Sequence, residues 1–215
     1  MPKVSPEYLE ARKNEILDAA FACFRRRGFH QATMQDIYRE AQLSPGAVYH
    51  YFRSKEEIIA AAIDRNTAEW TNLIAAVRSL EPSPNQALEA IGRHFFARFR
   101  EPDFEQQARM DVESWPEMLR DERALNAMRR QMAVLRASFV EMFRQAQAEG
   151  HLMKTQGLVP EHLVNLVFAA YVGLQLNALI EPDAVDPEGV LQALFGLLSS
   201  SDSDAHSALS AEREG

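Results

Sequence analysis

Apolar side chains recur at helical spacing along most of the chain. Ile16, Ala20 and Phe24 repeat every four residues, which predicts a first helix over residues 9–27 that ends at Gly28. No strand-like alternation of useful length occurs. The pattern therefore predicts an all-α protein.

Two short helices joined by a tight turn are predicted within residues 33–55. Thr33 and Asp36 have the spacing of a weak capping box at the start of the first helix. Ser44 can cap the second helix, and Pro45 then falls at its first position, where a missing N–H costs nothing. A third cap is expected at Ser54 and Glu57, opening a long helix.

The second short helix has an inward and an outward face. Val48 and Phe52 lie four residues apart and face inward. A helix-turn-helix of this size presents its second helix to the major groove of DNA. Small outward residues would let the backbone approach base edges, and the hydroxyl, imidazole and ammonium groups nearby suit phosphates. The predicted DNA-binding residues are Thr33, Gln35, Ser44, Pro45, Gly46, Ala47, Tyr49, His50, Tyr51 and Lys55. The alternative is a solvated surface of some all-α core.

The rest of the chain also reads as helices. They are expected near residues 55–80, 87–99, 104–115, 125–146, 163–180 and 190–198, with breaks at Pro102 and Pro116. Ser, Asp, Ala and Glu dominate after residue 198, so the end is expected to be disordered. The predicted organisation is a three-helix head over residues 1–55, a body over 56–199 for ligand binding and dimerisation, and a tail over 200–215.

Residues 163–180 are apolar nearly all round, but Asn165, Gln175 and Asn177 favour a buried helix over a membrane span. The last two helices carry more apolar surface than one chain can easily bury, which predicts a homodimer. The core of a monomer is the alternative. The expected interface residues are Leu163, Leu166, Val167, Leu174, Leu191, Leu194, Phe195 and Leu198.

The body is rich in aromatic and methionine side chains, which suit an adaptable pocket for a lipophilic molecule. For any one of them alone, a place in the core is the favoured explanation, whereas the group as a whole favours a pocket. Asp111, Glu113 and Glu69 could meet a cationic ligand or could simply form a soluble surface. The candidate pocket residues are Phe95, Phe99, Met110, Trp115, Met128, Met132, Phe139, Phe168 and Tyr171.

Charge is divided unevenly between head and body. The whole chain carries a net charge of −8, yet residues 1–55 hold nine Lys/Arg and six Asp/Glu, a net of +3, which leaves −11 for the remainder. A basic head on an acidic body fits a DNA reader with a separate sensing domain. The polar first ten residues lack the apolar core of a signal peptide, so a cytoplasmic location is expected.

Motifs of catalysis and metal binding are not found in the sequence. There is no glycine-rich phosphate loop and no GxSxG elbow. The six histidines lack metal-ligand spacing, and a single cysteine, Cys23, can form neither an internal disulfide nor a cysteine-based metal cluster. We therefore expect no enzyme activity, no metal and no cofactor.

Residues 33–55 and the helix before them resemble the tetracycline-repressor (TetR) family of bacterial transcription regulators, over about a quarter of the chain. Gln42, where the family usually has Gly, and Tyr38, where a small residue is usual, depart from the pattern. The matching residues are Thr33, Ile37, 41–46, 49–52, Ser54 and Lys55, with Ile16, Ala19, Ala20, Phe24, Gly28 and Phe29 upstream.

The resemblance implies a homodimer closed by its last two long helices as a four-helix bundle, and an inducer cavity inside the body. Together with the residues themselves, it indicates a ligand-responsive regulator. The expected partners are a palindromic operator in double-stranded DNA, a second copy of the chain and a small lipophilic inducer, with no membrane. A repressor is favoured; the alternatives are an activator, or an all-α carrier or enzyme that uses the body pocket.

Overall fold

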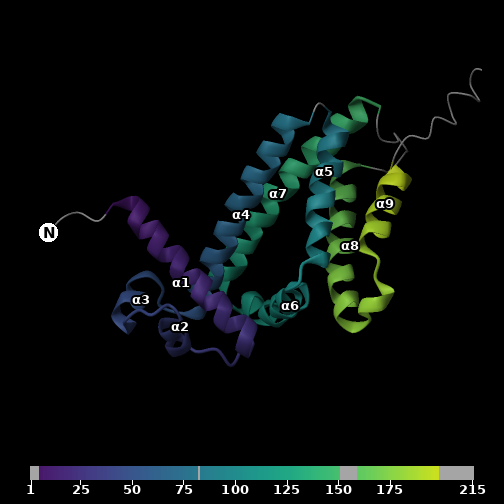
Figure 1. The fold of residues 1–215 in the computed structure, drawn as a ribbon. Helices are drawn as coiled ribbons and strands as arrows, with labels where there is room; N and C mark the ends of the chain where they lie inside the picture. The colour runs from purple at the N-terminus through teal and green to yellow at the C-terminus, as the bar shows by residue number, and fades with distance from the viewer. Residues whose placement is uncertain (1–4, 82, 151–158, 199–215) are drawn as a thin grey trace, which may run out of the picture.

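The computed structural model describes residues 5–81, 83–150 and 159–198, and among these the chain forms only helices (Figure 1). The prediction of an all-α fold is thereby confirmed; the predicted tail over 200–215 lies outside the described residues. The α-helices are α1 (Pro6–Arg27), α2 (Met34–Glu40), α3 (Pro45–Tyr51), α4 (Lys55–Leu80), α5 (Pro84–Ala97), α6 (Phe104–Arg120), α7 (Glu122–Ala148), α8 (Pro160–Ile180) and α9 (Pro187–Leu198), with short 3₁₀ segments η1 (Arg98–Arg100) and η2 (Pro182–Ala184).

Helices α1, α2 and α3 form the head around a closed apolar core. Ile16, Ile37 and Val48, one from each helix, have no exposed surface. Cys23 is buried in the same cluster, as a small hydrophobe would be. The first half of α1 extends away from the rest of the molecule (Figure 1).

Two predicted helix bounds need correction. Helix α1 begins at Pro6 because Ser5 accepts a hydrogen bond from the backbone N–H of Tyr8, at 3.3 Å, and Pro6 occupies the first helical position. Pro116 does not interrupt α6, which continues to Arg120. A proline removes one backbone donor, and the apolar face of α6 is packed on both sides of it, through Met110 and Met118.

The body is a layered helical bundle. Helices α4 and α7 run side by side along one edge, α5 and α8 form the middle, and α9 covers the far side (Figure 1). Its core cluster includes Ile91 of α5, Met142 and Phe143 of α7, and Leu163 of α8. This cluster is separate from that of the head.

Helix α4 is shared between the two clusters. Ile58 and Ile63 near its start belong to the head core, whereas Ile74 near its end belongs to the body core. Helices α6 and α7 also reach the head core, through Met118 and Ala124. The head core thus extends beyond residue 55, and the predicted domain boundary there falls within continuous packing.

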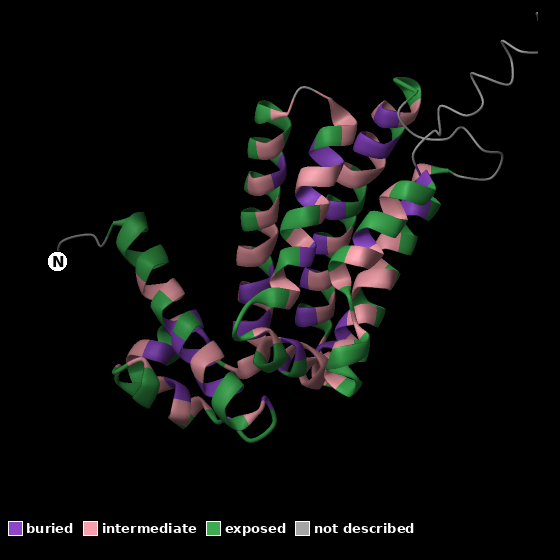
Figure 2. Ribbon diagram, turned by 45° about the vertical axis from the view of Figure 1, so that its right-hand side comes forward, coloured by how far each residue is buried: buried purple, intermediate pink, exposed green. Residues whose placement is uncertain are grey.

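Helix α8 is not the buried helix that was predicted. By length and composition this helix could cross a membrane. Only 17% of its most apolar 18-residue stretch is buried inside the chain. Exposed residues run along its outer side (Figure 2). Leu166 and Ile180, at 54% and 71% exposure, lie on this uncovered side.

The predicted interface residues divide into two groups. Leu163, Leu191 and Leu198 are buried within the chain itself, where α9 folds back onto α5. Val167, Leu194 and Phe195 line a cavity described below and Leu174 is half-buried, which leaves Leu166 as the well-exposed member of the set. A partner would therefore meet largely different residues from those that the sequence suggested.

Candidate DNA interface and body cavity

The turn between α2 and α3 is set by local hydrogen bonds. Thr33 Oγ1 accepts from the N–H of Asp36 at 3.2 Å, and the Asp36 carboxylate accepts from the N–H of Thr33 at 3.0 Å, so the capping box is complete. The Thr33 hydroxyl also donates to the Asp36 carboxylate at 2.7 Å, and this bond, together with the one from the Thr33 N–H, lowers the pKa of Asp36. Ser44 Oγ accepts from the N–H of Ala47 at 3.3 Å and begins α3.

Gln42 holds the turn in a left-handed conformation, with φ at 55°. It is the non-glycine residue of the described chain with positive φ. A side chain with a Cβ is strained there, which is why a glycine is favoured at such positions. The turn forms nonetheless, and Leu43 packs against the head core behind it.

Helix α3 presents a polar outer face on a rigid support. Val48 is fully buried on the inner side, while Gly46, Tyr49 and His50 are exposed on the outer side. A Cβ added to Gly46 would meet no atom within 4 Å, and the φ of this residue is ordinary. The fold therefore does not require glycine at this position, whereas close approach of another molecule to the backbone would.

Tyr38 extends this outer face from α2. Its ring lies 6.0 Å from that of Tyr49, and a side-chain hydrogen bond to Tyr49 raises the pKa of Tyr38. The sequence marked Tyr38 only as a departure from the family pattern. Its pairing with Tyr49 makes it part of the candidate DNA interface.

Besides Ser44, three of the predicted DNA-binding residues have other contacts in the head. Thr33 is exposed but uses its hydroxyl as the cap of α2, whereas Gln35 beside it is exposed. Tyr51 is half-buried against the head core. Lys55 donates from Nζ to the carbonyl oxygen of Phe29 at 2.9 Å and lies 4.6 Å from that ring centroid, so it ties α4 to the loop after α1. The predicted cap at Ser54 is half formed.

The predicted capping box at Ser54 and Glu57 lacks its second hydrogen bond, because the Glu57 carboxylate has other partners. Ser54 Oγ accepts from the N–H of Glu57 at 3.3 Å as predicted. The Glu57 carboxylate accepts instead from the N–H of Arg53, at 2.7 Å, and also pairs with Arg123 of α7. The start of α4 is thereby attached to the body.

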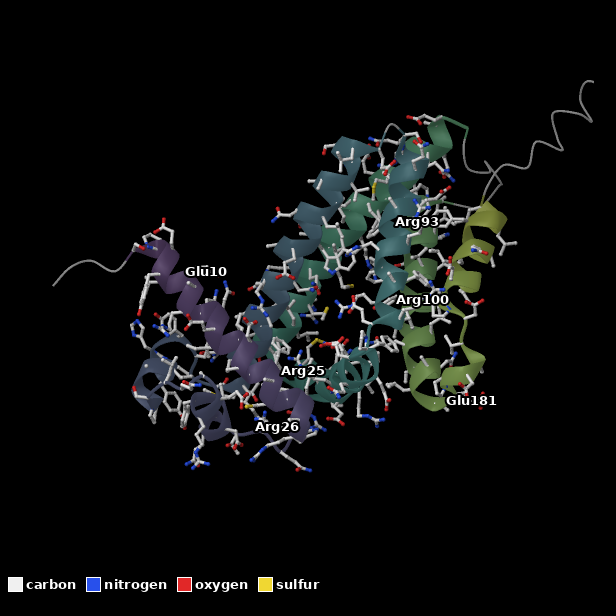
Figure 3. The ribbon with its side chains drawn as sticks, viewed as in Figure 1. Glu10, Arg25, Arg26, Arg93, Arg100 and Glu181 are labelled. Atoms are coloured by element: carbon white, nitrogen blue, oxygen red, sulfur yellow. The ribbon has the colours of Figure 1, made fainter. Side chains whose placement is uncertain are left out.

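Three arginines close α1, and two of them brace α2. Arg26 pairs with Glu40 at 2.6 Å and Arg27 with Asp36 at 3.1 Å. Arg25 lines a polar groove between the end of α1 and α6 (Figure 3). Two of these three arginines therefore have a structural role within the head.

These features define a helix-turn-helix DNA-binding regulator. Its second helix is capped and rigid, and the exposed polar face of that helix carries a glycine that the fold itself does not require.

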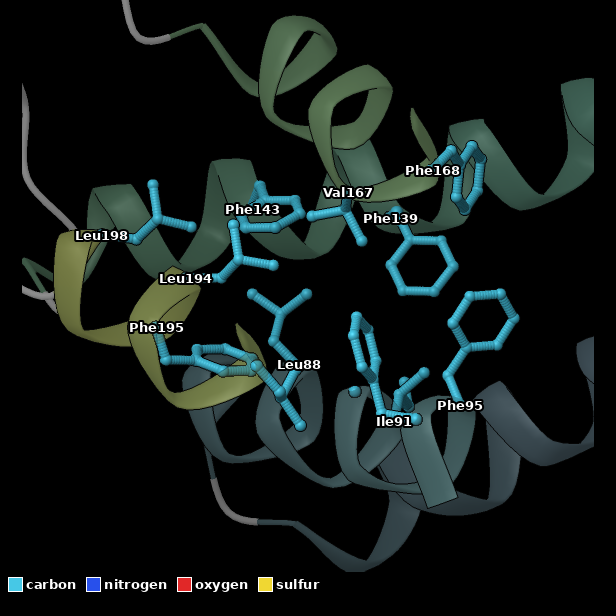
Figure 4. Close-up of a pocket in the computed structure, with 13 residues that line it drawn as sticks. Leu88, Ile91, Phe95, Phe139, Phe143, Val167, Phe168, Leu194, Phe195 and Leu198 are labelled. Atoms are coloured by element: carbon cyan, nitrogen blue, oxygen red, sulfur yellow. The ribbon is translucent and has the colours of Figure 1, made fainter. Parts of the chain in front are cut away.

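The body contains an apolar cavity between α5, α7, α8 and α9 (Figure 4). The space that atoms leave unfilled in this region, open solvent included, is about 510 Å³. Gly92 admits the rings and methyl groups of α9, since a Cβ there would lie 3.1 Å from Leu191 and from Phe195. The lining contains no charged or polar side chain; it consists of Leu88, Ile91, Gly92, Phe95, Phe96, Phe139, Phe143, Val167, Phe168, Leu191, Leu194, Phe195 and Leu198.

Three of the predicted pocket residues, Phe95, Phe139 and Phe168, line this cavity. The others lie elsewhere. Phe99 and Tyr171 form an aromatic group beside it, and Met132 packs on the body core. The structure corrects the remaining three, which pack on the head core because α6 and α7 start there: Met110, Trp115 and Met128. The sequence missed the contribution of α9, since helical spacing alone does not reveal which helices face one another.

The three acidic candidates are also dispersed. Glu69 is exposed on α4, 4.0 Å from Arg65, and Glu113 lies against Gly28 at the head. Asp111 alone is turned into the body, where it is half-buried. Among the residues that the structure describes, no group of three or more His, Cys, Asp or Glu could hold a metal ion.

Comparison with known proteins bears on the whole chain. A family model described as "Bacterial regulatory proteins, tetR family" matches residues 16–62. The HTH-type transcriptional repressor Rv1474c of Mycobacterium tuberculosis is 35% identical over 92 residues, which cover 40% of this chain and 49% of that protein. The chain thus spans about half the length of this curated relative, and less of the next ones.

Solved structures extend the likeness to the body. Salmonella enterica GusR matches with a TM-score of 0.67 at 25% identity, over 91% of this chain and 98% of that one. SmeT, the repressor of a Stenotrophomonas maltophilia multidrug efflux pump, solved with triclosan, matches with a TM-score of 0.70 at 23% identity, over 89% and 93%.

Residues 16–62 thus carry the helix-turn-helix head of the TetR family of transcriptional regulators, and the whole chain has the fold of solved regulators. Regulators of this family are not enzymes, which removes the enzyme alternative.

Proposed function

We propose that the protein is a cytoplasmic repressor that binds a palindromic operator as a homodimer and is released by a small lipophilic inducer. The observation that carries the proposal is the outer face of α3. Gly46 lies there in open space, with Tyr49 and His50 exposed beside it. A helix with these properties suits direct contact with base edges and phosphates.

The outer faces of α8 and α9 support a homodimer. Leu166 and Val172 of α8 are exposed at 54% and 37%, and Leu197 of α9 at 70%. Ala169 and Gly173 lie exposed on α8 at the same helical spacing. An apolar face with small residues is covered well by an identical face across a two-fold axis. Two heads would then read half-sites about one helical turn or more apart.

Contacts between α4 and α7 give a route from the cavity to the head. Arg130 of α7 pairs with Asp64 of α4 at 3.0 Å, and Gln131, buried, donates to Asn66 at 2.7 Å. Phe139 and Phe143 of the same α7 line the cavity. A ligand that repositions α7 would carry α4 and the head with it.

Release from DNA is then a population shift. The inducer must bind the conformer that fits the operator poorly more tightly than the conformer that fits it well. A hundredfold preference corresponds to about 2.7 kcal/mol. Relatives give this scheme its precedent: Rv1474c is named a repressor, and SmeT, a repressor with the same fold, is solved with triclosan.

The test is a gel shift of the full chain with its own upstream DNA. Gly46→Leu should abolish operator binding, because the added side chain would stand between the backbone and the bases, yet it should leave melting temperature and dimer unchanged. Ala75→Leu, which puts the same side chain at an exposed position of α4, is the matched control and should bind normally. Affinity of the unaltered protein should fall steeply with salt.

Normal operator binding by Gly46→Leu would show that α3 is not the reading helix. Absence of any specific duplex binding would favour the carrier alternative. A reporter gene placed behind the operator separates repressor from activator, since removal of the regulator raises expression in the first case and lowers it in the second.

A further inference from the structure

Asp111 is a carboxylate turned into the body without an ion-pair partner among the described residues. It lies on α6, and its two oxygens accept from Gln107 Nε2 and from Gln175 Nε2, each at 2.9 Å. Gln175 of α8 is itself 5% exposed. No Lys, Arg or His nitrogen of the described chain lies within 4 Å of Asp111, although Arg98 acts on it from farther away.

Burial raises the pKa of Asp111, the largest influence on this group, while the two glutamine hydrogen bonds and Arg98 act against it. Both glutamines are neutral donors, so they orient the carboxylate without balancing its charge. A half-buried carboxylate in this state is costly to the free protein.

A group of aromatic rings from four elements reaches this carboxylate through Tyr171, on which the Asp111 charge acts. Tyr171 is one turn before Gln175 on α8, on the same helix face. Its ring centroid is 3.8 Å from that of Phe95 on α5 and 5.3 Å from that of Phe99 in η1. Phe104, two turns before Asp111 on α6, lies 4.7 Å from Phe99. Burial raises the pKa of Tyr171 to about 12, so this ring is neutral and presents a phenol.

The aromatic group is continuous with the apolar cavity. Phe95 and Phe96 contact Tyr171 on one side and line the cavity on the other. Figure 4 shows Phe95 at one end of the cavity, opposite Leu198. An elongated molecule could therefore place an apolar part in the cavity and a head group beside Tyr171 and Asp111.

We propose that the body binds a lipophilic organic cation, an amine or quaternary ammonium with an apolar tail. The charged head lies at the Asp111 carboxylate beside Tyr171, and the tail fills the cavity past Phe95. Aromatic faces attract a desolvated cation, and the carboxylate supplies the counter-charge that the cavity lacks. The inference rests on the proposed function only in taking this site to be that of the inducer.

Three probes with one eight-carbon tail test the head group: octyltrimethylammonium, the neutral N-octylacetamide and the anionic octyl sulfate. Each is titrated into the full chain below micelle-forming concentrations and followed by calorimetry. Octyltrimethylammonium should bind at least about tenfold more tightly than N-octylacetamide, and octyl sulfate should bind most weakly.

Asp111→Asn removes the charge at constant shape. It should weaken octyltrimethylammonium by about tenfold or more and leave N-octylacetamide within about twofold. Glu105→Gln removes the same charge from an exposed position of α6 and should change neither affinity. Should Asp111→Asn fail to fold, Tyr171→Leu decides, with an expected loss of roughly threefold or more for the cation alone.

The inference is overturned if the unaltered protein fails to bind octyltrimethylammonium, or binds the neutral probe as tightly, or if both site variants retain full cation affinity. The last outcome would mean that Asp111 only joins α6 to α8, through its hydrogen bond with Gln175. Operator binding and dimerisation are measured on the same preparations. Cation binding without operator binding would refute the proposed function alone, and operator binding without cation preference would refute the site alone.

Discussion

In the head, Ile37 and Val48 have no exposed surface, whereas in the body Leu166 and Leu197 expose more than half of theirs. The head core is closed by α1, α2 and α3 together with the adjoining parts of α4, α6 and α7. The body leaves apolar surface uncovered twice, inside at the cavity and outside on α8 and α9. The difference is what the proposed function requires, namely a rigid head that reads DNA and a body that is completed by a ligand and a second copy.

The largest effect is expected from opening the head core. Ile37→Ala should lower the free energy of unfolding by about 2–5 kcal/mol, because the rigid surroundings cannot collapse into the space. Thermal and urea unfolding measure the loss. Leu80→Ala, at a side chain that is 80% exposed, is the control and should stay within about 0.5 kcal/mol. An equal cost at both positions would mean that the head core is not closed.

A charge on the outer face of the body should separate the dimer. Leu197→Glu would bury a carboxylate in each half of the interface and weaken association by about 3 kcal/mol, or roughly 100-fold. Sedimentation velocity over a dilution series gives the dissociation constant. Leu119→Glu, at an equally exposed leucine of α6, should leave the dimer intact. Dissociation by both variants alike would place the interface elsewhere.

Loss of the α2 cap should have a smaller effect. Thr33→Ala removes the acceptor for the Asp36 N–H and should cost about 1 kcal/mol. Thr71→Ala is the matched change, since that hydroxyl only returns to the Thr67 carbonyl at 2.8 Å within α4. Chemical denaturation separates the two, and a larger loss at Thr71 would contradict the role given to the cap.

The smallest expected effect has the opposite sign. Gln42→Gly should stabilise the protein by about 0.5–1 kcal/mol, because glycine adopts the φ of 55° without steric cost. The increase in melting temperature is the readout. A decrease would mean that the Gln42 side chain contributes more than its strained backbone costs.

Sequence patterns predicted the head more closely than the body. Cap residues such as Thr33 and Ser44 act within three residues of themselves, so their spacing specifies the structure directly. The cavity depends on α9 folding back over α5, and residues 92 and 191–195 meet only through that fold. Helical periodicity gives each helix an apolar side but not its neighbour, which is why Met110, Trp115 and Met128 were misassigned.

Lys55 shows the same limit within the head. Its position at a helix start predicted a phosphate contact, whereas its ammonium reaches back across 26 positions of sequence to the Phe29 carbonyl. A contact of that range has no local signature. The Lys55 ammonium thus joins the start of α4 to the loop after α1 by hydrogen bonds to the Phe29 and His30 carbonyl oxygens.

The uncovered side of α8 has a consequence for the lifetime of the protein. If folding is completed only by pairing, the abundance of the chain sets its resistance to proteolysis. At low abundance the chain would be degraded quickly, whereas at high abundance pairing would protect it from proteolysis. The threshold at which the controlled genes respond would then depend on gene dosage as well as on the concentration of the signal.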